Sequence, residues 1–257
     1  MITIEGFQKT LQFIDMFIEG TVSTVILSAL TVVFGFVLAL LLAAMRLSNF
    51  KLFRFSQKTV DGFVCPTLLN KLNQFRPISF IASLYIEVFR ATPMVVQLFI
   101  VYYVLLGDIA LPAYRLFGFI RVERMIPGII ALSLNSAAYL SEIIRSGIQS
   151  IDLGQTEAAR SLGLTQWQNM RYIILPQAIK NIFPAIANEF VTIIKESSIC
   201  FTIGVQEIMS AVKSSQMAAF AIAEPLLLAA AIYFCLTFPT SKIIEYFERK
   251  MSRGDRR

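Results

Sequence analysis

The feature that most constrains this chain is a set of long apolar runs, each about as long as a membrane-spanning helix. Such a helix needs about 20 mostly apolar residues, and five runs qualify, at residues 20–45, 81–106, 126–148, 172–194 and 221–244. Hydrophobic residues make up 56% of the 257 residues and charged ones only 16%, whereas soluble domains are about 25% charged. The sequence therefore predicts an all-α integral membrane protein with one transmembrane domain, residues 1–257.

Two features refine the first run. Residues 7–19 place apolar side chains at helical spacing among charged ones, which predicts a helix lying in the membrane interface. Within the run, Gly35, Ala39 and Ala43 form a stripe of small residues, which favours close packing of helices. The start of the second run is poorly defined, because Glu87, Arg90 and Pro93 fall in its first half.

The orientation follows from the basic residues, which gather between the first two runs and in the C-terminal tail. By the positive-inside rule both segments are cytoplasmic. Five spans then place the N-terminus outside, the C-terminus in the cytoplasm, and residues 149–171 in the cytoplasm as well. The basic residues lie beside apolar runs rather than in a separate hydrophilic domain, so they favour a topology signal over a nucleic-acid site.

The composition also bears on chemistry. There is no histidine, and the three cysteines, Cys65, Cys200 and Cys235, are far apart. This pattern predicts neither a metal site nor a disulfide framework, and no cofactor within the chain.

The predicted cytoplasmic loop is the most informative segment. Thr156 is suited to cap a short helix starting at Glu157, and Gly163 is suited to end that helix in a left-handed turn. The two alanines that follow Glu157 give the helix a flat surface of small side chains. The pattern favours a knob that docks on another protein.

The same loop resembles the signature of type I ABC importer permeases, which is Glu-Ala-Ala, three residues, Gly, nine residues, Ile, one residue, Leu-Pro. The resemblance implies that residues 154–176 contain a coupling helix seated in a cleft of the ATP-hydrolysing subunit. The coupling residues would be Glu157, Ala158, Ala159, Gly163, Leu175 and Pro176, and Ile173 completes the motif.

Other segments resemble the polar amino acid branch of that family, which transports histidine, glutamine, arginine or cystine. They are residues 85–98, where Ala91 replaces the usual Gly, then Tyr139 to Gly147, and residues 195–198, where Ser198 is followed by Ile rather than Leu. The resemblance covers residues 19–247 except for an atypical cytoplasmic insertion at 55–78. There, residues 66–77 predict a short interfacial helix, either a membrane-hugging linker or a partner-docking segment.

Polar residues within the runs are candidates for a substrate path, because buried polar groups in a membrane are expensive and usually functional. Tyr139, Glu142 and Arg145 share a helix face, where a local ion pair that locks the structure is favoured over substrate contact. Pro184 is a candidate hinge. The full set of path candidates is Asn135, Tyr139, Glu142, Asn188, Glu189, Lys195, Glu196 and Ser197.

These expectations combine into a permease subunit of an ATP-driven importer for polar amino acids in a bacterial or archaeal plasma (inner) membrane. The chain has no Walker motif, so ATP and magnesium would bind a partner ATPase and the chain itself would be no enzyme. The other expected partners are an extracytoplasmic binding protein, membrane lipid, and a second permease copy or a related subunit. The alternatives are a stand-alone ion-coupled carrier or channel, and a membrane-embedded hydrolase.

Overall fold

The computed structural model describes residues 2–47 and 76–252, which are almost entirely helical. The predicted insertion at 55–78, with its interfacial helix, lies for the most part outside these residues. The elements in chain order are α1 (Ile4–Leu11), α2 (Ile14–Leu47), α4 (Pro77–Ala91), α5 (Met94–Phe99), η1 (Ile100–Leu105), β1 (Arg115–Leu116), β2 (Ile120–Arg121), α6 (Val122–Gln149), α7 (Leu153–Ser161), α8 (Gln166–Asn169), η2 (Met170–Ile174), α9 (Leu175–Glu196), η3 (Ser197–Ile203), α10 (Ile208–Ala219) and α11 (Ala223–Ser252).

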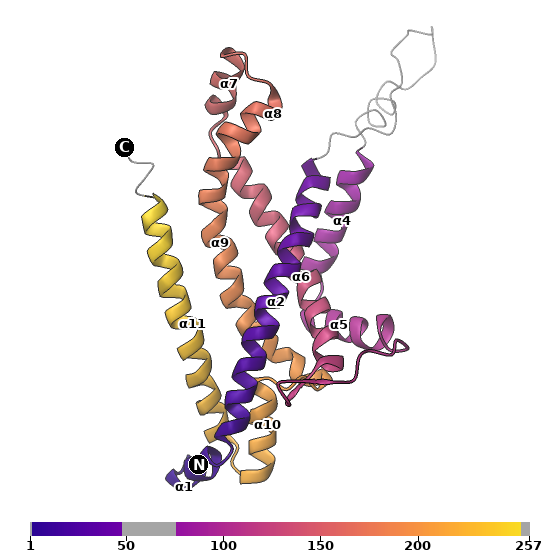
Figure 1. Cartoon of the computed structure of the whole chain (residues 1–257), viewed down its shortest axis with the longest axis vertical. Coiled ribbons are helices and arrows are strands. Elements are labelled where there is room, and N and C mark those ends of the chain that lie inside the picture. The colour runs from indigo at the N-terminus through magenta and orange to yellow at the C-terminus, as the bar shows by residue number, and fades with distance from the viewer. Residues whose placement is uncertain (1, 48–75, 253–257) are drawn as a thin grey trace.

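The long helices α2, α6, α9 and α11 run along the long axis of the molecule (Figure 1). The short helices α7 and α8 form a knob at one end, and α1 and α10 lie at the other end. The strands β1 and β2 form a small antiparallel hairpin just before α6. A bundle of long helices therefore lies between the knob at one end and the helices α1 and α10 at the other.

Three helices are long and apolar enough to cross a membrane, namely α2, α6 and residues 223–251 of α11. A fourth candidate consists of α4 together with residues 94–105, but these two parts meet at an angle of 109°. The predicted fourth run forms most of α9, which has 22 residues and does not meet the same combined criterion of length and apolarity. Within the described residues the membrane-spanning character is thus clear for three or four segments.

The bend in the second run follows from its sequence. Proline lacks a backbone N–H and disfavours a helical conformation in the residue before it. Thr92 and Pro93 accordingly have extended backbone angles, with ψ of 145° and 139°. The run is therefore broken into α4 and α5, which the apolar pattern alone did not predict.

The predicted close packing of the first run is confirmed. Ala39 is fully buried and Ala43 is 5% exposed. A Cβ atom on Gly35 would lie 3.3 Å from the Cβ of Ser136, so α2 and α6 approach each other closely. Around this contact Leu140 and Ile144 of α6 complete a core with the α9 side chains Ala178 and Ile182.

The prediction of one interfacial helix over residues 7–19 is wrong in its boundaries. The helix α1 ends at Leu11, and residues from Ile14 onward already belong to α2. In α1, Thr3 caps the N-terminus by accepting a hydrogen bond from the Gly6 N–H at 3.0 Å. The Thr3 N–H in turn donates to Glu224 Oε1 at 2.9 Å, which fixes α1 to the start of α11.

Candidate translocation path and coupling helix

The predicted knob is a helix, but it begins earlier than the sequence pattern indicated. Asp152 caps α7 by accepting a hydrogen bond from the Gly154 N–H at 2.6 Å, so the helix starts at Leu153 rather than at Glu157. Thr156 is not the cap. It lies inside α7, where its hydroxyl oxygen accepts a hydrogen bond from Asn169 Nδ2 at 3.3 Å. Asp152 outcompetes Thr156 because its carboxylate meets the first free N–H groups of the helix.

The two alanines of the motif have opposite environments. Ala159 is 1% exposed, whereas Glu157 and Ala158 of the same helix are exposed. Gly163 has φ of 78°, which confirms the predicted left-handed turn, and nothing lies within 4 Å of the position of a Cβ atom there. The surface of Glu157 and Ala158 is therefore free for a partner.

Large apolar side chains are also exposed on the knob and at its junction with α9. Leu153, Leu162, Trp167 and Tyr172 are 71–81% exposed. The sequence interpretation centred on the Glu-Ala-Ala motif and did not include these four residues, although their position in a predicted cytoplasmic loop was a signal. Exposed apolar patches of this kind mark interaction sites.

The knob is joined firmly to the long helix α9. Thr165 and Gln168 form a capping box at the start of α8, and η2 then leads into α9 without a break. Leu175, half-buried, and Pro176, exposed, form the first turn of α9. Proline is tolerated there because the first N–H groups of a helix have no partner within the helix. The motif residues Leu175 and Pro176 thus lie at the junction between knob and bundle.

In the middle of the bundle, neighbouring polar residues of α6 bond to two other helices. Asn135 Nδ2 donates to Gln97 Oε1 at 2.9 Å, and Ser136 Oγ donates to Glu189 Oε1 at 3.1 Å. Gln97 Nε2 also donates to the carbonyl oxygen of Thr92 at 3.0 Å. We call Gln97, Asn135, Ser136 and Glu189 the polar belt. The path candidate Asn135 thus lies beside Ser136, which bonds to the candidate Glu189 of α9, and the polar belt joins α5 and α9 to α6.

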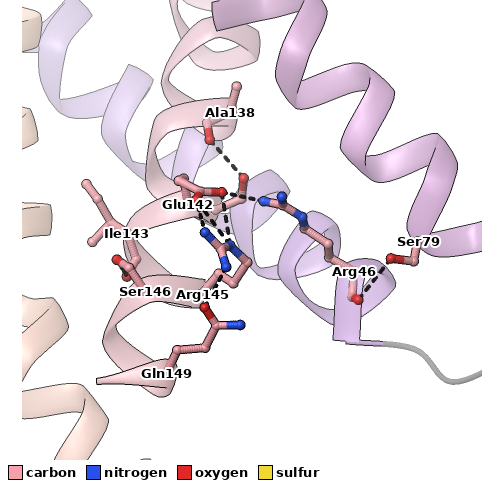
Figure 2. Close-up of polar contacts among 9 residues, drawn as sticks. Arg46, Ser79, Ala138, Glu142, Ile143, Arg145, Ser146 and Gln149 are labelled. Carbon is pink, nitrogen blue, oxygen red and sulfur yellow. Dashed lines mark hydrogen bonds and ion pairs between the residues drawn. The ribbon is translucent and has the colours of Figure 1, made fainter. Parts of the chain in front are cut away.

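About two turns from the belt, toward the knob, lies an ion-pair cluster shown in Figure 2. Glu142 of α6 accepts hydrogen bonds from Arg145 of the same helix and from Arg46 at the end of α2. The Arg145 Nε–Glu142 Oε1 distance is 3.1 Å. Ser79 Oγ donates to the carbonyl oxygen of Arg46 at 3.1 Å, which adds α4. We call Arg46, Glu142 and Arg145 the inner clasp.

The predicted ion pair between Glu142 and Arg145 is therefore present, and the inner clasp extends it to α2. The sequence interpretation had treated Arg46 only as a topology signal, because nothing in the pattern shows that α2 and α6 bring residues 96 positions apart together. The third predicted member, Tyr139, instead lies under Arg90, whose Cζ is 5.7 Å from the ring centroid. Tyr139 thus faces α4.

The remaining path candidates do not join either cluster. Lys195 and Glu196 are exposed at the end of α9, while Ser197 is buried and donates to the Ile194 carbonyl oxygen at 2.8 Å. Asn188 is exposed, and its carbonyl oxygen accepts a hydrogen bond from Thr192. The structure therefore divides the eight candidates between the polar belt, the inner clasp and its surroundings, and the far end of α9.

Comparisons with known proteins agree with this architecture. Residues 62–253 match the model of the family described as binding-protein-dependent transport system inner membrane component. The chain is 37% identical over 249 residues to the arginine transport system permease protein ArtQ of Bacillus subtilis (strain 168), covering 97% of this chain and 98% of the relative. It is 36% identical to the putative glutamine transport system permease protein GlnP of Rickettsia conorii, covering 91% of this chain and 92% of the relative.

Solved structures show the same fold. A crystal structure of an amino acid ABC transporter with histidines has a TM-score of 0.79 and 37% identity, and the match covers 97% of this chain and 100% of that one. The methionine ABC transporter MetNI, in an inward-facing conformation, has a TM-score of 0.60 at 18% identity, with 91% of this chain and 96% of that one covered. The chain belongs to the family of binding-protein-dependent transport system inner membrane components, as a multi-pass permease subunit of a transporter whose ATPase activity lies in the partner subunits.

Proposed function

We propose that the chain carries polar amino acids inward, with the knob of α7 and α8 docked on a partner ATPase in the cytoplasm. The single observation that carries the coupling role is that Ala159 is buried while Glu157 and Ala158 of the same short helix are exposed. A helix that only covered its own protein would bury its small residues and expose polar ones. This helix offers a smooth surface to something outside the chain.

The proposed topology has five passes, with the N-terminus outside and the C-terminus in the cytoplasm. In addition to α2, α6 and α11, the passes are the bent α4 to η1 segment and α9. The inclusion of α9 is supported by its position beside α6 and α11 in the bundle (Figure 1). A polar helix is tolerated among other helices because its polar groups face the bundle or a water-filled path.

The proposed mechanism is alternating access driven by the partner ATPase. Movement of the knob is transmitted through η2 into α9, because these elements are continuous. Helix α9 holds Glu189, which bonds to Ser136 of α6 at 3.1 Å. A displacement of α9 therefore acts directly on the polar belt. ATP binding and hydrolysis would set the populations of the outward-open and inward-open states.

The path is proposed to be completed by a second copy or a related subunit. Asn188, Lys195 and Glu196 are exposed in the single chain although they lie on a proposed membrane pass. Charged groups facing lipid are costly, so these side chains require a polar neighbour or water. A second permease subunit beside α9 would enclose them between two chains.

The substrate class is proposed from chemistry and from relatives. A zwitterionic amino acid needs a carboxylate for its ammonium group and amide or cationic donors for its carboxylate. Glu189 and Asn135 supply these types within the polar belt, and Lys195 and Glu196 supply them near one end of α9. Relatives that cover most of the chain are named for arginine and glutamine transport.

The coupling role is tested by adding bulk to an exposed alanine of the knob and, as a control, to an exposed alanine of α11. Ala158→Trp fills the exposed surface and is expected to abolish copurification of the ATPase after mild crosslinking in native membranes. Ala230→Trp makes the same change on the exposed side of α11 and is expected to leave copurification intact. Both variants are compared with wild type by mass spectrometry of the crosslinked partners.

The outcome also distinguishes the alternative function. Copurification of an ATPase with wild type and Ala230→Trp, and its loss in Ala158→Trp, supports the coupled importer. If a folded and abundant wild-type chain recovers no ATPase and still transports, the chain works as a stand-alone ion-coupled carrier or channel, and the proposed function is wrong.

A further inference from the structure

The β-hairpin before α6 contains an arrangement that is unfavourable for the isolated chain. Arg115 and Arg121 are direct partners across the two strands, and like charges in that position repel each other. Both are exposed, and neither makes a hydrogen bond or ion pair with any other residue in the described part of the chain. The nearby Arg124 is different, because it lies over the ring of Tyr102 at 5.5 Å.

The location of these arginines adds to the anomaly. The hairpin leads into α6 at the end of the bundle opposite the knob (Figure 1). In the proposed topology this is the extracytoplasmic end, where arginines in short loops are disfavoured. Arg115 and Arg121 are therefore cross-strand neighbours on the side of the membrane where the positive-inside rule disfavours basic residues.

The hairpin has two distinct faces. Leu116 and Ile120 are cross-strand partners, and Ile120 is 2% exposed within a core that includes Met125. Since successive side chains of a strand point to opposite faces, Arg115 and Arg121 lie on the face directed away from this core. The turn between the strands contains Phe117, which has φ of 54° and is 69% exposed. A bulky residue in that conformation is strained.

A cavity of about 380 Å³ lies at the same end of the molecule. Its apolar and aromatic lining includes Tyr102, Tyr103, Leu106, Ile109 and Leu111, and the first turn of α6 adds one acid and one base, Glu123 and Arg124. Protein interfaces commonly combine an apolar, tyrosine-rich centre with arginines around it. This combination favours a protein partner over lipid headgroups, which offer negative charge and no side chain to enter such a cavity.

We propose that the hairpin arginines Arg115 and Arg121, with the adjoining cavity, form the docking surface for an acidic region of the extracytoplasmic binding protein. This inference rests on the proposed function, which requires such a protein at this end of the chain. The arginines pair with carboxylates of the partner, and the cavity accepts one of its apolar side chains. The charges also speed the encounter of the two proteins, because opposite potentials steer association.

The test begins with wild-type chain carrying a photo-crosslinking amino acid at position 117, which identifies the protein that contacts the hairpin in native membranes. That protein is then purified, and its binding to the permease–ATPase complex in phosphatidylcholine nanodiscs is measured by surface plasmon resonance. The double variant Arg115→Glu/Arg121→Glu is expected to lower the association rate by about tenfold or more at low salt. The difference is expected to shrink as salt screens the charges.

The matched control is Arg115→Lys/Arg121→Lys, which keeps the charge and is expected to retain most of the association rate. Acid-to-lysine changes on the crosslinked face of the binding protein are expected to restore association with the glutamate variant. This rescue would not occur if the arginines only stabilised the hairpin.

Two outcomes would overturn the inference. The first is crosslinking from position 117 to lipid alone, with phosphatidylglycerol enrichment around the complex lost in the glutamate variant. The second is an association rate unaffected by charge reversal at any salt concentration. Both are distinct from failure of the proposed function, which shows as absence of the ATPase from the wild-type complex.

Discussion

At the scale of single residues, Glu142 is the carboxylate at the centre of the inner clasp. It bonds to Arg46 and Arg145 and is only partly exposed, with 24% of its side chain accessible. Glu142→Gln keeps the shape of the side chain and leaves two arginines without their counter-charge. We expect a loss of about 1–3 kcal/mol in stability, measured as a lower thermal unfolding midpoint of the purified protein.

Glu245 provides the control for this prediction. It also lies between two cations, Lys242 and Arg249, but all three belong to α11 and the cations are 60% and 69% exposed. Exposed pairs within one helix contribute about 0.3–0.5 kcal/mol, so Glu245→Gln is expected to change the midpoint very little. Equal effects of the two substitutions would mean that the inner clasp does not hold α2 to α6.

At the scale of elements, the crossing of α6 and α9 depends on the absence of a side chain at Gly147. A Cβ atom there would overlap Cγ1 of Ile182, so one of the two helices or the Ile182 side chain must move. Gly147→Ala is expected to destabilise the protein by about 1–3 kcal/mol.

The companion variant removes the opposing atoms. Ile182→Ala leaves a cavity when made alone, but in the Gly147→Ala background it makes room for the new methyl group. We expect the double variant to be more stable than the sum of the two single effects predicts, by at least about 0.5 kcal/mol. Additive effects in thermal unfolding would show that the helices do not meet at this point.

The bend between α4 and α5 is a second feature of this scale. Gln97 Nε2 donates to the carbonyl oxygens of Phe89 and Thr92 at 2.8 and 3.0 Å, and Asn135 donates to Gln97. Gln97→Met removes these hydrogen bonds at the bend, at a cost of about 1–3 kcal/mol. We expect lower stability and reduced amino acid uptake by cells expressing the variant.

Gln177 is the matched control for Gln97. Its Nε2 also donates to a carbonyl oxygen, that of Ile173 at 2.9 Å, but both residues belong to one continuous helical segment. Gln177→Met is expected to retain stability and uptake near wild type. A similar loss in both variants would assign the effect to the glutamine side chain in general and not to the bend.

At the scale of the whole molecule, two substitutions at Gly163 distinguish the effect of backbone strain from the effect of blocking the ATPase docking surface. Its φ of 78° disfavours other residues, yet nothing lies within 4 Å of a Cβ atom there. Gly163→Ala is therefore expected to cost only about 1 kcal/mol and to retain the ATPase in crosslinking experiments. Gly163→Trp adds bulk beside the proposed docking surface, and this variant is expected to lose the ATPase in the same experiment. Loss of the ATPase in Gly163→Ala would instead assign the effect to the turn itself.

Several features followed from the sequence because each depends on short-range pattern. Apart from the broken second run, the apolar runs correspond to long helices, and the spacing from Glu157 to Pro176 identified the knob and the left-handed turn at Gly163. The cap at Asp152 was missed because Thr156 is also a common capping residue, and only the backbone path shows which side chain meets the free N–H groups.

By itself the sequence determined the membrane-protein class, the small-residue packing stripe of α2 and the motif that marks the knob. Only the tertiary structure decided that Arg46 joins Glu142, that Asn135 bonds to Gln97 across a bend, and that Ser136 bonds to Glu189. The physical reason is range: helix periodicity and capping are set by residues a few positions apart. Polar contacts between helices depend instead on the rotation and depth of each helix, which packing of the whole bundle establishes.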